Sequence, residues 1–225
     1  MSEVVLVVVA HPDDESISMA GTIVKHVSKG DKVFVVSMTD GVGARGNSKK
    51  HQIKNRKISS EGASKELGFQ WGDCYDFNDN AMDGYSLIEI VKVVEKAKLK
   101  YEPTLVYTCS GADLNVDHRV VANAVLTAFR PEPNEKCKEL RLFEVASATD
   151  FGNAAITGSF VPNLFINISA AWPLKERALE AYSAEMRDYP HSRSIKGIKN
   201  LAKLRGNQVG YELAEAFEVI RKLES

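Results

Sequence analysis

The sequence predicts an α/β fold in which a doubly wound, mostly parallel sheet is flanked by helices, with a helical C-terminal third. Two observations carry this prediction. Apolar runs rich in valine alternate with stretches of helical spacing, which is the pattern of successive βαβ units. The first apolar runs are continuous rather than alternating with polar residues, which is typical of strands buried on both faces of a parallel sheet.

The first half of the chain shows this alternation clearly. The expected elements are a strand over 4–9, a helix over 15–29, a strand over 32–39, a glycine-rich loop over 40–46, a polar basic helix over about 48–67 and an amphipathic helix over 87–98. Gly30 and Gly68 follow the first two helices directly. A glycine in this position is a common C-terminal cap, because it adopts the left-handed conformation that ends a helix.

The second half continues with elements of the same kinds. They are a strand over 104–109, a helix over 117–129, strand candidates over 140–148 and 164–168, and helices over about 174–187, 195–204 and 209–223. Pro131 and Pro133 end the helix before them, because proline cannot continue a helix. No repeat, low-complexity tract or long linker divides the chain, so we expect one Rossmann-like domain over 1–225. The C-terminal helices should cover one face or one edge of its sheet.

The composition excludes several classes of protein. The formal net charge is −1, which implies no broad electrostatic affinity for nucleic acid or for anionic membranes. No run approaches the ~18 apolar residues of a membrane span, and the first run is too short for a signal peptide. The three cysteines lack C-x-x-C spacing, which fits a reducing compartment without disulfides. We therefore expect a soluble cytoplasmic protein without membrane insertion.

The most informative stretch follows the first expected strand and reads Ala-His-Pro-Asp-Asp-Glu over 10–15. Open α/β sheets bind their ligands beyond the carboxyl ends of the strands, which is where this stretch should lie. His11 and Asp14 are suitable ligands for a divalent metal, which leaves Asp13 free to act as a base. The stretch therefore predicts a metal-activated water and a carboxylate that deprotonates it.

A third ligand is expected far along the chain, at His118. It follows the strand expected over 104–109, so it should reach the same edge of the sheet as His11. Two imidazoles and one carboxylate, with an open position for water, are the pattern of a catalytic metal site. Asp117 could orient one of the ligands. In the alternative interpretation His11 and Asp117 only cap the helices that follow them, but His118 together with the earlier motif favours the metal site.

These two motifs resemble those of the PIG-L (LmbE-like) family of metal-dependent sugar N-deacetylases. The similarity covers nearly the whole chain and extends to four further segments, namely 77–83, 113–119, 130–131 and 190–194, which resemble members found in bacterial polysaccharide biosynthesis. It implies zinc (Zn²⁺) held by His11, Asp14 and His118, with Asp13 as the general base. It also implies an N-acetylated sugar or sugar nucleotide as substrate. Such a ligand set accepts Fe²⁺ as well, and the number of subunits stays open, although relatives are often oligomeric.

One position departs from the family pattern. Many members carry a histidine three residues before the last ligand, where it is proposed to stabilise the oxyanion or to protonate the leaving group. This chain has Asn115 there, and an amide cannot supply a proton near neutral pH. We therefore expect Asp13 to serve as both base and acid, with Asn115 as a polar contact.

Further residues are candidates for binding the substrate. Arg56 lies where the family often carries a substrate-binding arginine, and His191 resembles a tail histidine of the subgroup; both could equally be solvated surface residues. The glycine-rich loop with Arg45, Lys49 and Lys50 could receive the phosphate of a nucleotide-linked sugar, or could carry solvated lysines only. It is a weak match to a dinucleotide-binding motif, because it follows the second strand and precedes a basic helix.

Two other functions stay open at the level of sequence. The chain could be a sugar- or nucleotide-binding module without chemistry, although retention of His11, Asp13, Asp14 and His118 argues against this, since buried ionisable groups without a ligand are costly. It could also hydrolyse a different amide, such as an amino-acid conjugate, with the same metal site.

Overall fold

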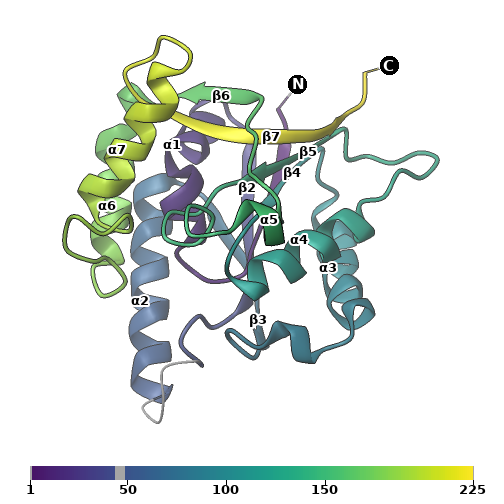
Figure 1. Cartoon of the computed structure of the whole chain (residues 1–225). Helices are drawn as coiled ribbons and strands as arrows, with labels where there is room; N and C mark the ends of the chain where they lie inside the picture. The colour runs from purple at the N-terminus through teal and green to yellow at the C-terminus, as the bar shows by residue number, and fades with distance from the viewer. Residues whose placement is uncertain (1, 44–48, 225) are drawn as a thin grey trace.

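The computed structural model describes residues 2–43 and 49–224, and strands and helices alternate along it much as expected (Figure 1). The elements are β1 (Val4–Val9), α1 (Asp14–Ser28), β2 (Lys32–Thr39), α2 (Lys49–Leu67), β3 (Gln70–Phe77), α3 (Leu87–Tyr101), β4 (Leu105–Cys109), α4 (Val116–Ala128), β5 (Glu139–Phe143), α5 (Ala154–Thr157), β6 (Leu164–Asn167), α6 (Trp172–Ala181), α7 (Ile195–Asn207) and β7 (Ala214–Lys222). None of these helices is long and apolar enough to span a membrane.

The strands of the described residues form one sheet in the order β3-β2-β1-β4-β5-β7-β6. Strands β1 to β5 run parallel to one another, whereas β7 pairs antiparallel with β5 on one side and with β6 on the other. From β1 the chain first adds strands on one side and then, at β4, on the other. The prediction of a doubly wound α/β fold is confirmed, and ligands of such sheets bind at this reversal, beyond the carboxyl ends of β1 and β4.

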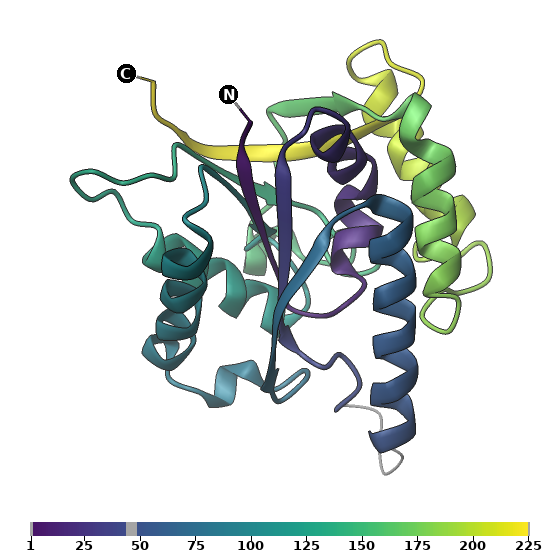
Figure 2. The same cartoon turned by 180° about the vertical axis from the view of Figure 1, so that it is seen from behind.

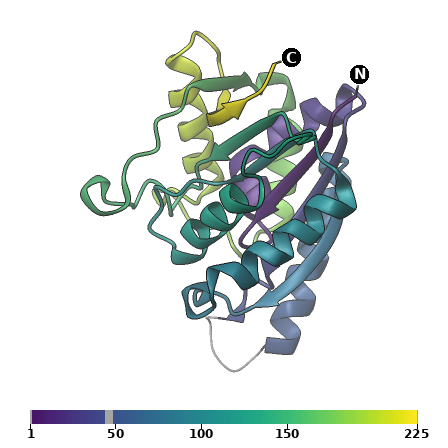
Figure 3. The same cartoon turned by 90° about the vertical axis from the view of Figure 1, so that its right-hand side faces the viewer.

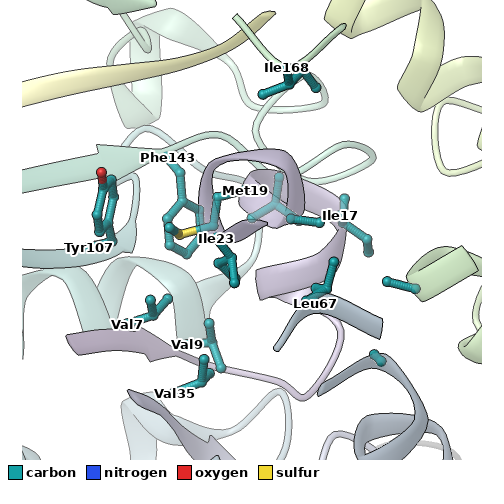
Figure 4. Packing of buried hydrophobic residues seen from close by; sticks show 14 of the residues in the cluster. Val7, Val9, Ile17, Met19, Ile23, Val35, Leu67, Tyr107, Phe143 and Ile168 are labelled. Atoms are coloured by element: carbon teal, nitrogen blue, oxygen red, sulfur yellow. The ribbon is translucent and has the colours of Figure 1, made fainter. Parts of the chain in front are cut away.

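Helices cover both faces of the sheet (Figures 2 and 3). The core on one face lies under α1, α2, α6 and α7, and the core on the other lies under α3 and α4. Val7 and Val9 of β1 belong to the first core, and Leu6 and Val8 belong to the second. Figure 4 shows Val7 and Val9 in the first core, which also contains Met19 of α1. Because successive side chains of a strand point to opposite faces, a strand covered on both sides must be apolar throughout.

The prediction of a helix over 209–223 is wrong, because residues Ala214–Lys222 form the strand β7. Its buried residues lie at the start of the strand, and both of its edges are paired, one with β5 and one with β6. Tertiary pairing of this kind overrides local helix propensity. The last third of the chain is therefore less helical than the sequence predicts.

Other boundaries also differ from the prediction. Strand β3 was not expected; it is an edge strand, largely half-exposed, with Asp73 and Asp76 interrupting its apolar residues. Charged residues of this kind protect an exposed edge from pairing with other chains. The strand expected over 140–148 ends at Phe143, and the helix expected over 174–187 ends at Ala181.

Candidate metal centre

Three buried side chains meet beyond the carboxyl ends of β1 and β4. His11 lies two residues after β1, Asp14 begins α1, and His118 lies in the first turn of α4. The Nε2 atom of His118 is 3.3 Å from Nδ1 of His11 and 3.3 Å from Oδ1 of Asp14. The other carboxylate oxygen of Asp14 is 3.5 Å from Nδ1 of His11. The structure thus brings together the three residues that the sequence predicts as ligands, although they come from distant parts of the chain.

Carboxylates hold the outer nitrogen of each imidazole ring. Nε2 of His11 is 3.1 Å from Oδ2 of Asp117 and 3.2 Å from Oδ1 of Asp79. Nδ1 of His118 is 3.0 Å from Oδ2 of Asp113. A carboxylate in this position keeps the ring proton on the outer nitrogen, which leaves the inner nitrogen free to donate its lone pair. Both free lone pairs then face the carboxylate of Asp14.

The outer carboxylates are themselves held in place. Asp117 accepts hydrogen bonds from the backbone N–H groups of Asn80 and Met82, at 2.7 and 3.0 Å. Asp113 accepts one from the hydroxyl group of Thr149 at 2.7 Å. Because both Asp117 oxygens already accept hydrogen bonds, its alternative grouping with His11 and Asp79 is a poorer candidate for a cation than His11, Asp14 and His118.

Sequence reasoning placed Asp117 beside a ligand but missed Asp79 and Asp113. Asp113 could have been found, since it lies in the same loop as His118, five residues before it. Asp79 lies in segment 77–83, which resembles the family, but its place beside His11 could not be inferred, because it follows β3, a strand that the sequence did not predict.

The electrostatics of the cluster favour a positive charge at its centre. Burial lowers the pKa of His118, but Asp14 and Asp113 outweigh it and raise that pKa to about 9. Burial likewise opposes the ionised form of Asp14, yet His118 and His11 hold its pKa well below the usual value. Within the described part of the chain, the buried Oδ1 atom of Asp14 makes no hydrogen bond. A divalent cation would satisfy this oxygen and both ring lone pairs, so the donor set fits one.

Asp13 is buried beside the cluster but turns toward a different set of partners. Its backbone φ is +154°, an unusual value for a residue other than glycine, and this turn separates its side chain from that of Asp14. Its Oδ2 atom is 3.4 Å from Arg56 and 3.6 Å from Arg193. Burial raises the pKa of Asp13, while the two guanidinium groups oppose that shift.

A small polar cleft opens in front of Asp13. It is lined by His11, Asp13, Gly41, Arg56, Asp79, Asn80, Asn115 and Arg193. The side chain of Asn115 caps α4 through its oxygen and donates from Nδ2 to Asn80, so it forms part of the wall. Arg56 donates to the carbonyl oxygen of Pro12 and forms an ion pair with Glu185 at 2.6 Å.

Arg193 is a lining residue to which the sequence analysis assigned no role. It also donates from Nε to the hydroxyl group of Ser147 at 2.8 Å. The predicted His191 is two residues away and is exposed; it accepts a hydrogen bond from the backbone of Arg193 and is not among the lining residues. Arg45 of the predicted phosphate loop lies outside the described residues, and Lys50 is exposed. The phosphate contact therefore stays a prediction.

Comparison with known proteins identifies relatives of this fold and sequence. The family model PIG-L, described as GlcNAc-PI de-N-acetylase, matches residues 6–129. The chain is 26% identical over 229 residues to a diacetylchitobiose deacetylase of Thermococcus kodakarensis, covering 96% of this chain and 82% of that protein. It is 27% identical over 188 residues to a probable N-acetyl-alpha-D-glucosaminyl L-malate deacetylase 2 of Bacillus anthracis, covering 80% of each.

Solved structures of lower identity share the fold. An N,N'-diacetylchitobiose deacetylase from Pyrococcus horikoshii aligns with a TM-score of 0.79 at 22% identity, covering 97% of this chain and 84% of that one. GalB, the 4-carboxy-2-hydroxymuconate hydratase from Pseudomonas putida, aligns with a TM-score of 0.77 at 19% identity, covering 99% and 98%. These two proteins carry different names for their reactions, so similarity at this level establishes the fold alone.

Proposed function

The chain belongs to the PIG-L family, and from this we propose that it is a metal-dependent hydrolase that removes the acetyl group from an N-acetylated sugar or sugar nucleotide. The observation that carries the proposal is the buried triangle of His11, Asp14 and His118, with Asp13 beside it and facing a polar cleft. The names of the two relatives described above are those of deacetylases, and the substrates in those names are N-acetylated sugars.

His11, Asp14 and His118 would hold the cation, with Asp117 and Asp79 fixing the first ring and Asp113 the second. Bound there, Zn²⁺ or Fe²⁺ would lower the pKa of a water molecule and polarise the amide carbonyl group of the substrate. Both metals suit this donor set, and we propose zinc.

Asp13 would accept a proton from the attacking water and return it to the departing amine. Arg56 and Arg193 flank its carboxylate and would keep it directed into the cleft. Asn115 would contact the substrate but transfer no proton, because its amide group neither gains nor loses one near neutral pH.

The shared fold would also accommodate a different reaction, as the hydratase among the structural neighbours illustrates. A binding module without chemistry is disfavoured by the cluster itself. Burying His11, Asp13, Asp14 and His118 together costs stability that a binding function alone would not require.

The test is release of acetate from a panel of amides by purified protein, before and after treatment with a chelator and after return of Zn²⁺ or Fe²⁺. We expect release from diacetylchitobiose, N-acetylglucosamine or UDP-N-acetylglucosamine that is lost with the metal and restored by it. Release only from an N-acetyl amino acid would reassign the substrate class. Release that survives complete removal of metal would overturn the proposal. Equal rates on free and nucleotide-linked sugars would argue against a phosphate contact.

A further inference from the structure

Helix α1 is broken one turn after the candidate ligand Asp14. Met19 has φ −139° and ψ 20°, which are not helical values. The backbone N–H groups of Gly21 and Thr22, just beyond the break, donate to the carboxylate of Glu215 at 2.9 and 2.7 Å. The hydroxyl group of Thr22 donates to the same carboxylate at 2.6 Å. Glu215 belongs to β7, so a strand at the far end of the chain caps the second part of α1.

Lys175 of α6 contacts the part of α1 that precedes the break. Its ammonium group donates to the carbonyl oxygen of Ile17 at 2.9 Å and to Glu215 at 2.7 Å. In an unbroken α-helix the carbonyl of Ile17 would accept from the N–H group of Gly21, four residues later. The ion pair supplies a new partner to each group of this missing backbone bond. Lys175 donates to the carbonyl oxygen of Ile17, and Glu215 accepts from the N–H group of Gly21.

The two charged residues are almost completely buried, with Lys175 2% exposed and Glu215 4% exposed. A buried ion pair by itself is weak evidence for a stabilising role, because removing two charges from water offsets their attraction. Apolar residues in their place would leave the broken backbone groups without partners. The pair is therefore suited to maintaining the break rather than to filling the core.

The break separates the first turn of α1 from the remainder, which packs on the sheet. That turn carries Asp14 and Glu15, and its direction sets where the carboxylate of Asp14 meets His11 and His118. The residue that follows α6 reaches this turn at a second point, because the hydroxyl group of Tyr182 donates to Glu15 at 3.0 Å.

We propose that Lys175 and Glu215 are positioning residues of the metal centre. By holding α1 broken at Met19, they fix the direction of its first turn and so the placement of Asp14 against the two imidazoles. This inference rests on the proposed metal centre. It assigns to residues of the C-terminal segment the orientation of a ligand that lies near the N-terminus.

The experiment measures Co²⁺ binding rather than turnover, by titration calorimetry and by the visible absorption of the Co²⁺ protein, with the melting temperature recorded in parallel. The variants are Lys175→Met, Glu215→Gln and the milder Thr22→Val, which removes a single hydrogen bond to Glu215. The matched control is Glu144→Gln. Glu144 lines the same small cavity as Lys175 and Glu215, but its ion pair is with Arg205 and not with α1.

We expect Lys175→Met and Glu215→Gln to weaken Co²⁺ binding about tenfold, in the range found for residues that orient metal ligands, and to change the absorption spectrum. Thr22→Val should act in the same direction by less, and Glu144→Gln should leave both readouts unchanged. Wild-type affinity and spectrum in Glu215→Gln and Thr22→Val would overturn the inference, even with a lower melting temperature and even if Lys175→Met fails to fold. Absence of Co²⁺ binding in the unsubstituted protein would instead overturn the metal centre itself.

Discussion

The turn after β1 and the C-terminal segment from α6 to β7 build the same site in different ways. The turn supplies His11 and Asp14, two of the three candidate ligands, from residues that are neighbours in the chain. The C-terminal segment supplies no candidate ligand; its contributions are Lys175, Tyr182, Arg193 and Glu215, each of which contacts a residue of the turn or of α1.

The turn after β1 therefore supplies groups that would take part in the reaction, whereas the C-terminal segment supplies contacts that orient them. Metal ligands can be gathered in a short motif, because the chain reverses direction sharply where β1 gives way to α1. The residues that orient such a motif must approach it from outside. Asp79 and Asp117 do so from the middle of the chain, and Lys175, Tyr182 and Arg193 do so from positions more than 150 residues later. A substitution in the turn should therefore abolish chemistry, whereas one in the C-terminal segment should reduce it.

The largest effect is expected from Asp13→Asn. The amide keeps the size of the side chain but cannot accept the proton of the attacking water, so kcat should fall by about 10²- to 10⁴-fold. Metal content, measured by elemental analysis, should stay at the wild-type level, because Asp13 is not a candidate ligand. The matched control is Asp73→Asn, at a half-exposed residue of the edge strand β3. An Asp13→Asn protein that retained most of its activity would remove the base from the mechanism.

Next in size is Asp113→Asn, which keeps a side-chain oxygen near Nδ1 of His118 but removes its charge. The imidazole then loses the carboxylate that fixes its tautomer, and metal affinity should fall about 10- to 100-fold. Competition with a chromophoric chelator measures it. Asp150→Asn, at an exposed residue of the loop that also holds Thr149, should bind metal normally. Unchanged affinity in Asp113→Asn would show that the ring needs no such partner.

Asp13 and strand β7 show how much of the site and of the fold can be predicted from the sequence. Asp13 could be assigned from its neighbours, since the apolar run before it identifies a buried strand and the polar residues after it must lie at that strand's carboxyl end. β7 could not be assigned in this way, because the apolar residues of Ala214–Lys222 fit helical as well as extended spacing. Pairing of this segment with the edges of β5 and β6 decides between helix and strand, and this pairing is a tertiary interaction. Arg193 was missed for the same reason: its meaning depends on tertiary contact with Asp13.

A smaller effect is expected from Arg193→Ala. Without this guanidinium group the carboxylate of Asp13 keeps Arg56 but loses one of its two arginine neighbours among the described residues, and its placement in the cleft becomes less well defined. A displacement of this kind should lower kcat/KM about tenfold, below the ~100-fold that follows from a full 1 Å misplacement. Metal content should not change. Arg177→Ala, which breaks an exposed ion pair with Glu66, serves as the control. A loss in Arg193→Ala no larger than in this control would make the C-terminal segment irrelevant to Asp13.

The smallest effect, and the sharpest comparison within the C-terminal segment, is expected from His191→Ala. The family resemblance makes His191 a candidate pocket residue, whereas the structure leaves it exposed, with its ring 5.9 Å from that of Phe151 and its Nδ1 accepting from the backbone of Arg193. Losing this exposed hydrogen bond should lower the stability of the loop by about 0.5–1.5 kcal/mol. Because His191 does not line the cleft, little of that cost should reach the reaction, and we expect kcat/KM within about threefold of wild type, a smaller loss than in Arg193→Ala. Parallel assays of the two variants on the same substrate decide the matter. A larger loss in His191→Ala than in Arg193→Ala would mean that the loop closes over the substrate, and the histidine of the sequence prediction would then be the contact.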